Sequence, residues 1–123
     1  MIRRFAIVLI CVGALAAAEA PETVMVTFHA KPGAEADLER VIARHWETAR
    51  RLNMVREAPH TTVRGTEDGD RVYFVDIFTW RDGSIPDAAP AGLQAIWGEM
   101  NRLVEARGGR PGLEFVPVSV VDQ

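Results

Sequence analysis

Apolar and polar residues alternate through part of the chain and repeat at helical spacing through the rest. The longest alternating stretch, residues 71–80, has largely apolar side chains on both of its faces, and the turn-forming residues 67–70 precede it. A strand that covered the core with only one side would show one polar face. The pattern therefore predicts that residues 71–80 form a central strand covered from both sides.

Three further stretches are predicted to be strands. Residues 23–30 alternate as a first strand, and residues 60–66 pair with the central strand as a hairpin. Residues 113–121 alternate as a last strand that contains Pro117. Because proline cannot donate a hydrogen bond to a neighbouring strand, we expect the last strand to lie at an edge or to bulge at this residue.

Two stretches have apolar residues at helical spacing. Residues 34–54 form one stripe that includes His45, which is therefore aimed inward, while Trp46 lies at the border of the stripe. Residues 91–107 form the second stripe, and Gly108-Gly109 is predicted to end that helix.

The predicted order is β-α-β-β-α-β, an α+β ferredoxin-like fold with a four-stranded antiparallel sheet and two helices on one face. Two helices can cover only one face of such a sheet. The other face still carries apolar side chains, so we expect a second copy to cover it. The result is a homodimer closed around a shared α/β barrel.

The first twenty residues have the three-part plan of a secretory signal peptide: basic Arg3 and Arg4, an apolar stretch, and then small residues. Cleavage is expected after Ala18 or Ala20, and residues 21–123 are predicted to form a single domain. The apolar stretch is short for a transmembrane helix, so we expect a periplasmic or secreted protein without stable membrane insertion. An uncleaved membrane anchor is the alternative. The only cysteine, Cys11, lies in this segment, so the processed chain would have neither disulfides nor cysteine-based metal sites.

The charge of the chain bears on its partners. The formal net charge is −3 and the sequence pI is about 5.6, which argues against a polyanion such as nucleic acid as a partner. The β-α-β-β-α-β order also occurs in RNA-binding domains, and Tyr73 and Phe78 give that alternative superficial support. The predicted export and the acidic charge argue against it.

Several features together resemble a known family. They are the Lys31-Pro32-Gly33 turn after the first strand, the long first helix, the Thr79-Trp80-Arg81-Asp82 end of the central strand, and the valine-rich last strand. In these features the chain resembles the dimeric α/β barrel superfamily, and within it the antibiotic biosynthesis monooxygenase-like (ABM-like) domains. The resemblance implies a ligand pocket between sheet and helices. Some members are cofactor-independent monooxygenases that act on aromatic polyketides, and others degrade haem.

The resemblance to the haem-degrading members is limited to one residue. Trp80 corresponds to the tryptophan that ends a strand in those proteins. They also use an asparagine on the first strand and a histidine on the second helix, and neither is present here. The sequence therefore argues against haem degradation, and no cofactor is predicted.

Two polar residues in apolar surroundings are the catalytic candidates. Asp76 lies in the middle of the central strand, where a carboxylate needs a partner or water. It could form a salt bridge with Arg64 on the adjacent strand, or it could be a polar anchor in a pocket. His45 could be a core residue with a satisfied hydrogen bond, or it could contact a ligand and act as a base near neutral pH.

The ligand-binding candidates are mainly aromatic, and core packing is the alternative for most of them. They are Trp46, Phe74, Phe78, Trp80, Trp97 and Met100, and three tryptophans beside one cavity would favour a flat aromatic ligand. His29 faces the expected dimer interface and His60 is expected to be exposed. No two histidines have the spacing of a metal site, so no metal is predicted.

Two hypotheses for the function remain open. The first is an exported protein that binds a small apolar or aromatic molecule between sheet and helices and oxidises it without metal or flavin. The second is a non-catalytic periplasmic binding or assembly module of the same fold. The second hypothesis predicts a filled interior with no cavity beside His45.

Overall fold

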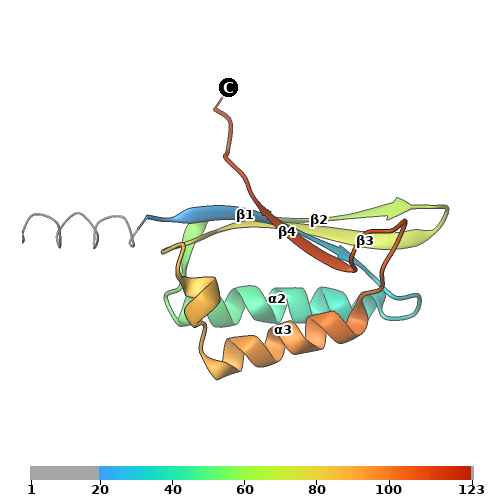
Figure 1. The fold of residues 1–123 in the computed structure, drawn as a ribbon, viewed down its shortest axis with the longest axis horizontal. Helices are drawn as coiled ribbons and strands as arrows, with labels where there is room; N and C mark the ends of the chain where they lie inside the picture. Colours follow the sequence, from blue (N-terminus) through green and yellow to red (C-terminus); the bar gives the residue numbers. More distant parts are fainter. Residues whose placement is uncertain (1–19, 123) are drawn as a thin grey trace, which may run out of the picture.

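The computed structural model describes residues 20–122, which form a four-stranded antiparallel sheet with two helices against one face (Figure 1). The predicted signal peptide lies outside the described residues except for Ala20, and Cys11 lies outside them as well. No helix within residues 20–122 is long and apolar enough to cross a membrane.

The elements follow the predicted order, with one short 3-10 helix added. They are β1 Glu22–His29, α2 Glu35–Arg51, β2 Val55–Glu67, β3 Arg71–Trp80, η1 Ile85–Ala88, α3 Ala91–Leu103 and β4 Leu113–Pro117. The strand order across the sheet is β2-β3-β1-β4. The predicted ferredoxin-like α+β fold is therefore confirmed, with β3 inside the sheet and β4 at an edge.

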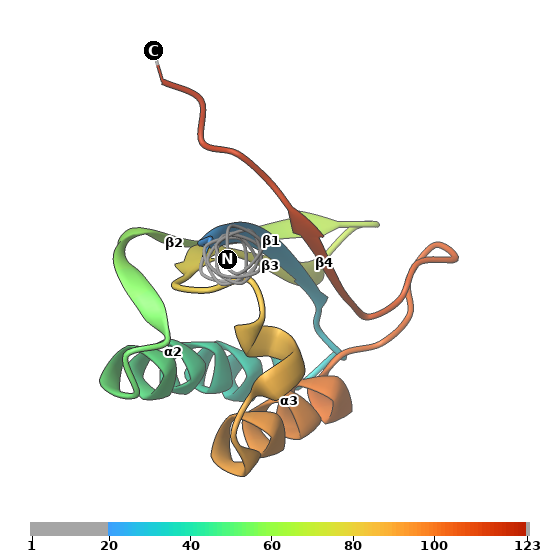
Figure 2. The same ribbon diagram turned by 60° about the vertical axis from the view of Figure 1, so that its left-hand side comes forward.

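The helices cover the sheet face that carries the even-numbered residues of β3. This face is packed against the buried stripes of the two helices, and both helices lie on the same side of the sheet (Figures 1 and 2). The buried side chains are Val72, Phe74, Asp76, Phe78 and Trp80 on β3, Leu38, Val41, Ile42, His45 and Ala49 on α2, and Leu93, Ile96 and Met100 on α3. The central position of β3 and the inward-facing stripes of α2 and α3 therefore agree with the prediction from the sequence pattern.

The opposite face of the sheet has no helix over it (Figure 1). It carries apolar side chains from all four strands. They are Met25, Val63, Val75, Ile77 and Val116, which the strand registers place on one side of the sheet. Val63 and Val116 are 50% and 44% exposed, so this face is open to solvent in the single chain.

The predicted end of the second helix is wrong. The helix ends at Leu103 instead of Arg107, because the chain then becomes extended and Val104 pairs with Ala30 next to β1. Gly108 and Gly109, with φ of 60° and 77°, form the two-residue turn of a small hairpin between Arg107 and Arg110. Positive φ at both residues suits such a turn, so the glycines make a hairpin instead of ending a helix.

Two strand boundaries also differ from the prediction. β2 begins at Val55, before the predicted start at His60, and its register with β3 shifts between these two residues. β4 ends at Pro117, four residues before the predicted end at Val121. Val118 still donates a backbone hydrogen bond to Thr23, and the described residues beyond it extend away from the sheet (Figures 1 and 2). Period-two alternation continues through them, which is why the sequence predicts a longer strand.

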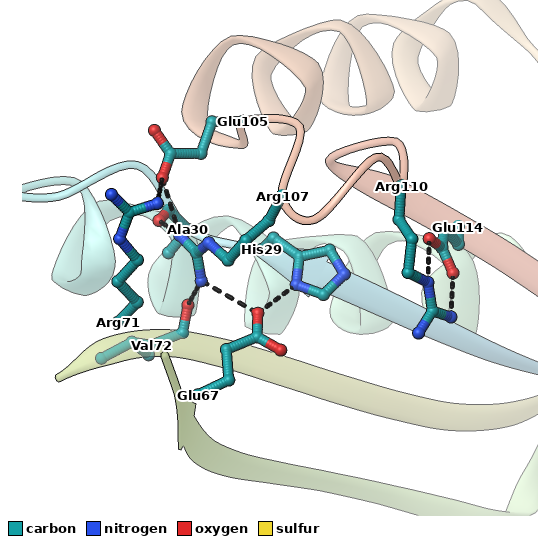
Figure 3. Close-up of polar contacts among 9 residues, drawn as sticks. All are labelled: His29, Ala30, Glu67, Arg71, Val72, Glu105, Arg107, Arg110 and Glu114. Carbon is teal, nitrogen blue, oxygen red and sulfur yellow. Dashed lines mark hydrogen bonds and ion pairs between the residues drawn. The ribbon is translucent and has the colours of Figure 1, made fainter. Parts of the chain in front are cut away.

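A buried arginine joins the ends of several elements at one end of the sheet (Figure 3). The Arg107 side chain is 2% exposed and donates to the backbone carbonyls of Ala30 at 2.6 Å and Val72 at 3.0 Å. It also donates to the carboxylates of Glu67 at 3.0 Å and Glu105 at 2.9 Å. Four acceptors from separate segments therefore share one guanidinium group.

His29 belongs to the same cluster. Its Nδ1 lies 2.5 Å from Oε1 of Glu67, and the residue is 4% exposed. Partial burial alone would raise the pKa of Glu67, but hydrogen bonds from His29 and Arg107 lower it below its usual value. His29 therefore packs within its own chain, and the expectation that it faces a symmetry mate is not supported.

Candidate functional site

A cavity of about 290 Å³ lies between the sheet and the helices. Residues from six elements line it. They are Glu22, Val24, Val26 and Phe28 on β1, His45 on α2, Asp76, Phe78 and Trp80 on β3, Pro86 and Asp87 on η1, Trp97, Met100 and Asn101 on α3, and Leu113 and Phe115 on β4. The cavity lies where the family resemblance implies a pocket.

Alternation along β3 explains why three of the candidates converge. Asp76, Phe78 and Trp80 are two residues apart, so all three point to the helix-covered side of the sheet. Their partners on β1 are Val26, Val24 and Glu22, which also line the cavity. The inward stripes of α2 and α3 bring His45 and Trp97 to the opposite wall.

The aromatic rings of the cavity stand nearly perpendicular to one another. The centroids of Phe78 and Trp80 are 5.0 Å apart with an interplanar angle of 79°, and those of Trp80 and Trp97 are 6.3 Å apart at 83°. Edge-to-face contacts of this kind stabilise aromatic clusters. The rings of Phe78, Trp80 and Trp97 therefore form a corner in the wall of the cavity.

His45 is held in one tautomer by Trp97. The indole Nε1–H of Trp97 donates to Nε2 of His45 at 2.9 Å, so a neutral His45 carries its proton on Nδ1. Burial, with a smaller contribution from nearby His60, lowers the pKa of His45 to about 4. The interpretation of His45 as a base near neutral pH is therefore not supported. Its lone pair is already engaged, and the ring can act only as a hydrogen-bond donor through Nδ1.

Asp76 is the most deeply buried charged group of the cavity, with 1% of the residue exposed. The hydroxyl of Thr62 donates to its Oδ1 at 2.7 Å. Nε2 of His60 lies 3.2 Å from the same oxygen, within ion-pair distance but without hydrogen-bond alignment. Burial raises the pKa of Asp76, although Thr62 and His60 oppose the rise. No described residue donates a hydrogen bond to Oδ2, which leaves that oxygen available to a ligand.

Two predictions about Asp76 and its neighbours are wrong. Arg64 does not pair with Asp76. Its guanidinium is 4.0 Å from Glu39 and 5.8 Å from the ring of Phe74, which is its register partner. His60, expected to be exposed, is instead packed between Asp76 and Trp46. Its ring stacks on Trp46 with centroids 3.7 Å apart and an interplanar angle of 12°.

Six of the eight predicted site residues line the cavity, and two do not. The six are His45, Asp76, Phe78, Trp80, Trp97 and Met100. Trp46 does not line it because its position at the border of the helical stripe turns the ring toward β2, where it meets His60. Phe74 is 1% exposed and packs in the core, two residues along β3 from Asp76. Only two tryptophans therefore flank the cavity.

The sequence did not identify the polar residues at the edge of the cavity. Glu22 is half-buried, and Asp87 and Asn101 are exposed, so these three residues mark its rim. Phe115, which is 67% exposed, adds a fourth ring from the edge strand. Alternation places Glu22 and Phe115 on the helix-covered side of the sheet, but the position of Asp87 depends on a loop that has no periodic signal.

A second depression, of about 420 Å³, lies between α2 and α3. It is more open, and most of the residues that line it are charged. Arg40 pairs with Asp37 and Arg44 with Glu99, so most of its charges are already matched. The aromatic cavity is therefore the better candidate site. No group of three metal-ligating side chains occurs within the part of the chain that the structure describes.

Comparisons with known proteins identify the fold. No protein-family model and no curated protein matches the sequence. Solved structures do. A mutant of SnoaB, a cofactor-independent oxygenase from Streptomyces nogalater, is 21% identical with a TM-score of 0.60, and the match covers 84% of this chain and 95% of that one.

Two other solved structures are similar to the same degree. A protein described as an antibiotic biosynthesis monooxygenase is 16% identical with a TM-score of 0.60, over 84% of this chain and 100% of that one. A dimeric ferredoxin-like protein of unknown function from Jannaschia sp. CCS1 is 21% identical with a TM-score of 0.58, over 82% and 100%. The chain therefore has the ferredoxin-like fold of ABM-like proteins, as the resemblance implies.

Proposed function

We propose that the chain is an ABM-like protein that binds a small apolar or aromatic molecule in the cavity between its sheet and helices. The observation that carries this proposal is the cavity itself. It is walled by Phe78, Trp80 and Trp97, and buried Asp76 supplies a polar group. An apolar pocket with a few convergent polar groups is the usual form of a small-molecule site. A cavity beside His45 also argues against an assembly module with a filled interior.

The proposal includes export and dimerisation. The signal-peptide pattern of residues 1–20 supports a periplasmic or secreted location. The open apolar face and the similarity to a dimeric ferredoxin-like protein support a homodimer. The second copy would cover the sheet face opposite to the cavity, so each chain would keep its own site.

If the chain dimerises through the open face, a single charge introduced on that face should prevent dimerisation. Ile77 lies on this face between its register partners Met25 and Thr61. Ile77→Asp would place a carboxylate in the apolar interface, and we expect the variant to sediment as a monomer while the parent sediments as a dimer. Ala43→Asp adds the same charge at an exposed position of α2 and should remain dimeric. A parent chain that sediments as a monomer would contradict the proposed dimer.

A cofactor-independent oxygenation is the reaction that the fold and the site support best. Asp76 would accept a proton from a phenol- or enol-type substrate, because burial raises its pKa and Oδ2 is available. His45 would donate a hydrogen bond from Nδ1 to the oxygen of the resulting anion. The anion would then react with dioxygen from solution to form a carbon–oxygen bond. With an anthrone, one oxygen atom becomes the new carbonyl of the anthraquinone, and the other leaves as water with the two hydrogens that the substrate loses. The alternative remains a non-catalytic binding protein with the same cavity.

Oxygen uptake separates these two alternatives. With an anthrone or quinol as substrate, we expect uptake that falls by about 100-fold in Asp76→Asn, the usual size of a general-base contribution. Asparagine keeps an acceptor for the Thr62 hydroxyl, so the variant should fold. If these compounds bind without any uptake of oxygen, the non-catalytic alternative is correct.

A further inference from the structure

The lining of the cavity is acidic and, within the described residues, contains no lysine or arginine. Glu22, Asp76 and Asp87 contribute three carboxyl groups. Neither Glu22 nor Asp87 forms an ion pair within the described chain. The one histidine in the lining, His45, is neutral at pH 7 because its pKa is about 4. The ionisable side chains of the lining therefore sum to a negative charge.

His60 lies behind the wall of the cavity and could carry a positive charge. It approaches Asp76 from the β2 side, at 3.2 Å. A protonated His60 would balance the charge of Asp76 and nothing more. The two carboxylates at the rim, Glu22 and Asp87, would remain unbalanced, and a partly enclosed cavity with low-dielectric walls concentrates their field.

The aromatic walls of the cavity also favour a cationic ligand. The faces of aromatic rings are negatively polarised, and a cation within about 6 Å of a ring centroid is attracted to the ring, most strongly when water is excluded. Trp80 and Trp97 meet at 83°, so their rings form a corner that presents ring surface in two directions. Such a corner can stack against the ring of a ligand on one wall and accept a cationic group near the other.

Asp76 supplies a counter-charge at the inner end of the cavity. It is 1% exposed, and within the described chain only its Oδ1 is engaged. An anionic ligand would face Asp76 and the rim carboxylates without any cation to balance it, which is costly at low dielectric. A neutral ligand would gain no charge–charge attraction from these carboxylates. A cationic ligand would be attracted by all three.

We propose that the cavity selects a small aromatic molecule bearing a protonated amine or quaternary ammonium group over neutral and anionic molecules of the same shape. This inference rests on the proposed function, because it names the ligand class of the same site. The aromatic corner holds the ring of the ligand, and the carboxylates of Asp76, Glu22 and Asp87 select its charge.

Calorimetric titration with three naphthalene derivatives of one shape tests the inference. The probes are 2-naphthylmethylamine, which is protonated at pH 7, neutral 2-naphthalenemethanol and anionic 2-naphthoate. We expect the amine to bind the processed protein at least tenfold more tightly than the alcohol, and the naphthoate to bind most weakly. The double variant Glu22→Gln with Asp87→Asn should reduce the advantage of the amine at least threefold. Asp70→Asn, which removes a charge in the β2–β3 turn, should preserve it.

Each contrary outcome has a distinct meaning. Equal or tighter binding of the alcohol or the naphthoate would overturn the cationic preference while leaving the cavity as the binding site. An equal loss of preference in Asp70→Asn would attribute it to the net charge of the protein and would also overturn the inference. If none of the three probes binds, the proposed function falls as well.

Discussion

Replacing Arg107 by methionine is expected to lower the free energy of unfolding by about 3 kcal/mol, as measured by urea denaturation. The substitution keeps an unbranched apolar side chain but removes the donors shared by Glu67, Glu105 and two backbone carbonyls. Removing one partner of a buried ion pair costs about 3–5 kcal/mol, because the other charge remains buried and unpaired. The side chains of Glu67 and Glu105 are 30% and 28% exposed, so water reaches them and the lower value applies.

Arg110 provides a matched control three residues away (Figure 3). It makes a two-bond contact with Glu114, at 2.9 and 2.7 Å, but its side chain is 66% exposed. Exposed ion pairs contribute little to stability, so Arg110→Met should unfold at nearly the urea concentration of the parent. Equal losses in the two variants would show that burial of the Arg107 cluster is not what stabilises this end of the sheet.

The second large effect is a dependence of stability on pH that comes from His45. Its pKa is about 4 in the folded chain, against 6.5 for a histidine that is fully exposed to water in the unfolded chain. Between these two values the unfolded chain binds a proton that the folded chain does not, so stability falls as the pH falls from 6.5 to 4. The loss from this one residue amounts to about 3 kcal/mol.

His45→Gln isolates that contribution. Glutamine does not titrate, and its amide oxygen can still accept the hydrogen bond of the Trp97 indole. We expect the stability advantage of the parent over the variant to shrink by about 3 kcal/mol between pH 7 and pH 4. Asp76, whose raised pKa acts in the opposite direction, is present in both proteins and cancels in the difference. Parallel pH profiles would show that His45 is as easily protonated in the folded chain as in the unfolded one.

Periodic patterns predicted the fold and much of the candidate site. Alternation along β3 decides which of its residues face the helices, so Asp76, Phe78 and Trp80 could be placed on one side of the sheet from the sequence. The stripe of α2 likewise places His45 inward. These residues depend only on the period of their own element, and that is why they converge as predicted.

Features that depend on contacts between elements could not be predicted in this way. The approach of His60 to Asp76 depends on the pairing of β2 with β3, in which His60 lies opposite Phe78 and Thr62 opposite Asp76, and alternation within one strand does not reveal this contact. The burial of Arg107 requires that α3 end at Leu103, and this end is set by the pairing of Val104 with Ala30. Trp46 lies at the border of its stripe, where a small rotation decides between the cavity and the neighbouring strand.

The most direct test of the binding site is an NMR titration of the indole N–H groups of the three tryptophans with 2-naphthalenemethanol. Trp80 and Trp97 line the cavity, whereas Trp46 stacks on His60 outside it. The proposed site predicts that the signals of Trp80 and Trp97 shift to saturation while that of Trp46 moves least, after assignment by single Trp→Phe variants. A titration that shifts mainly Trp46, or none of the three signals, would contradict the cavity as the binding site.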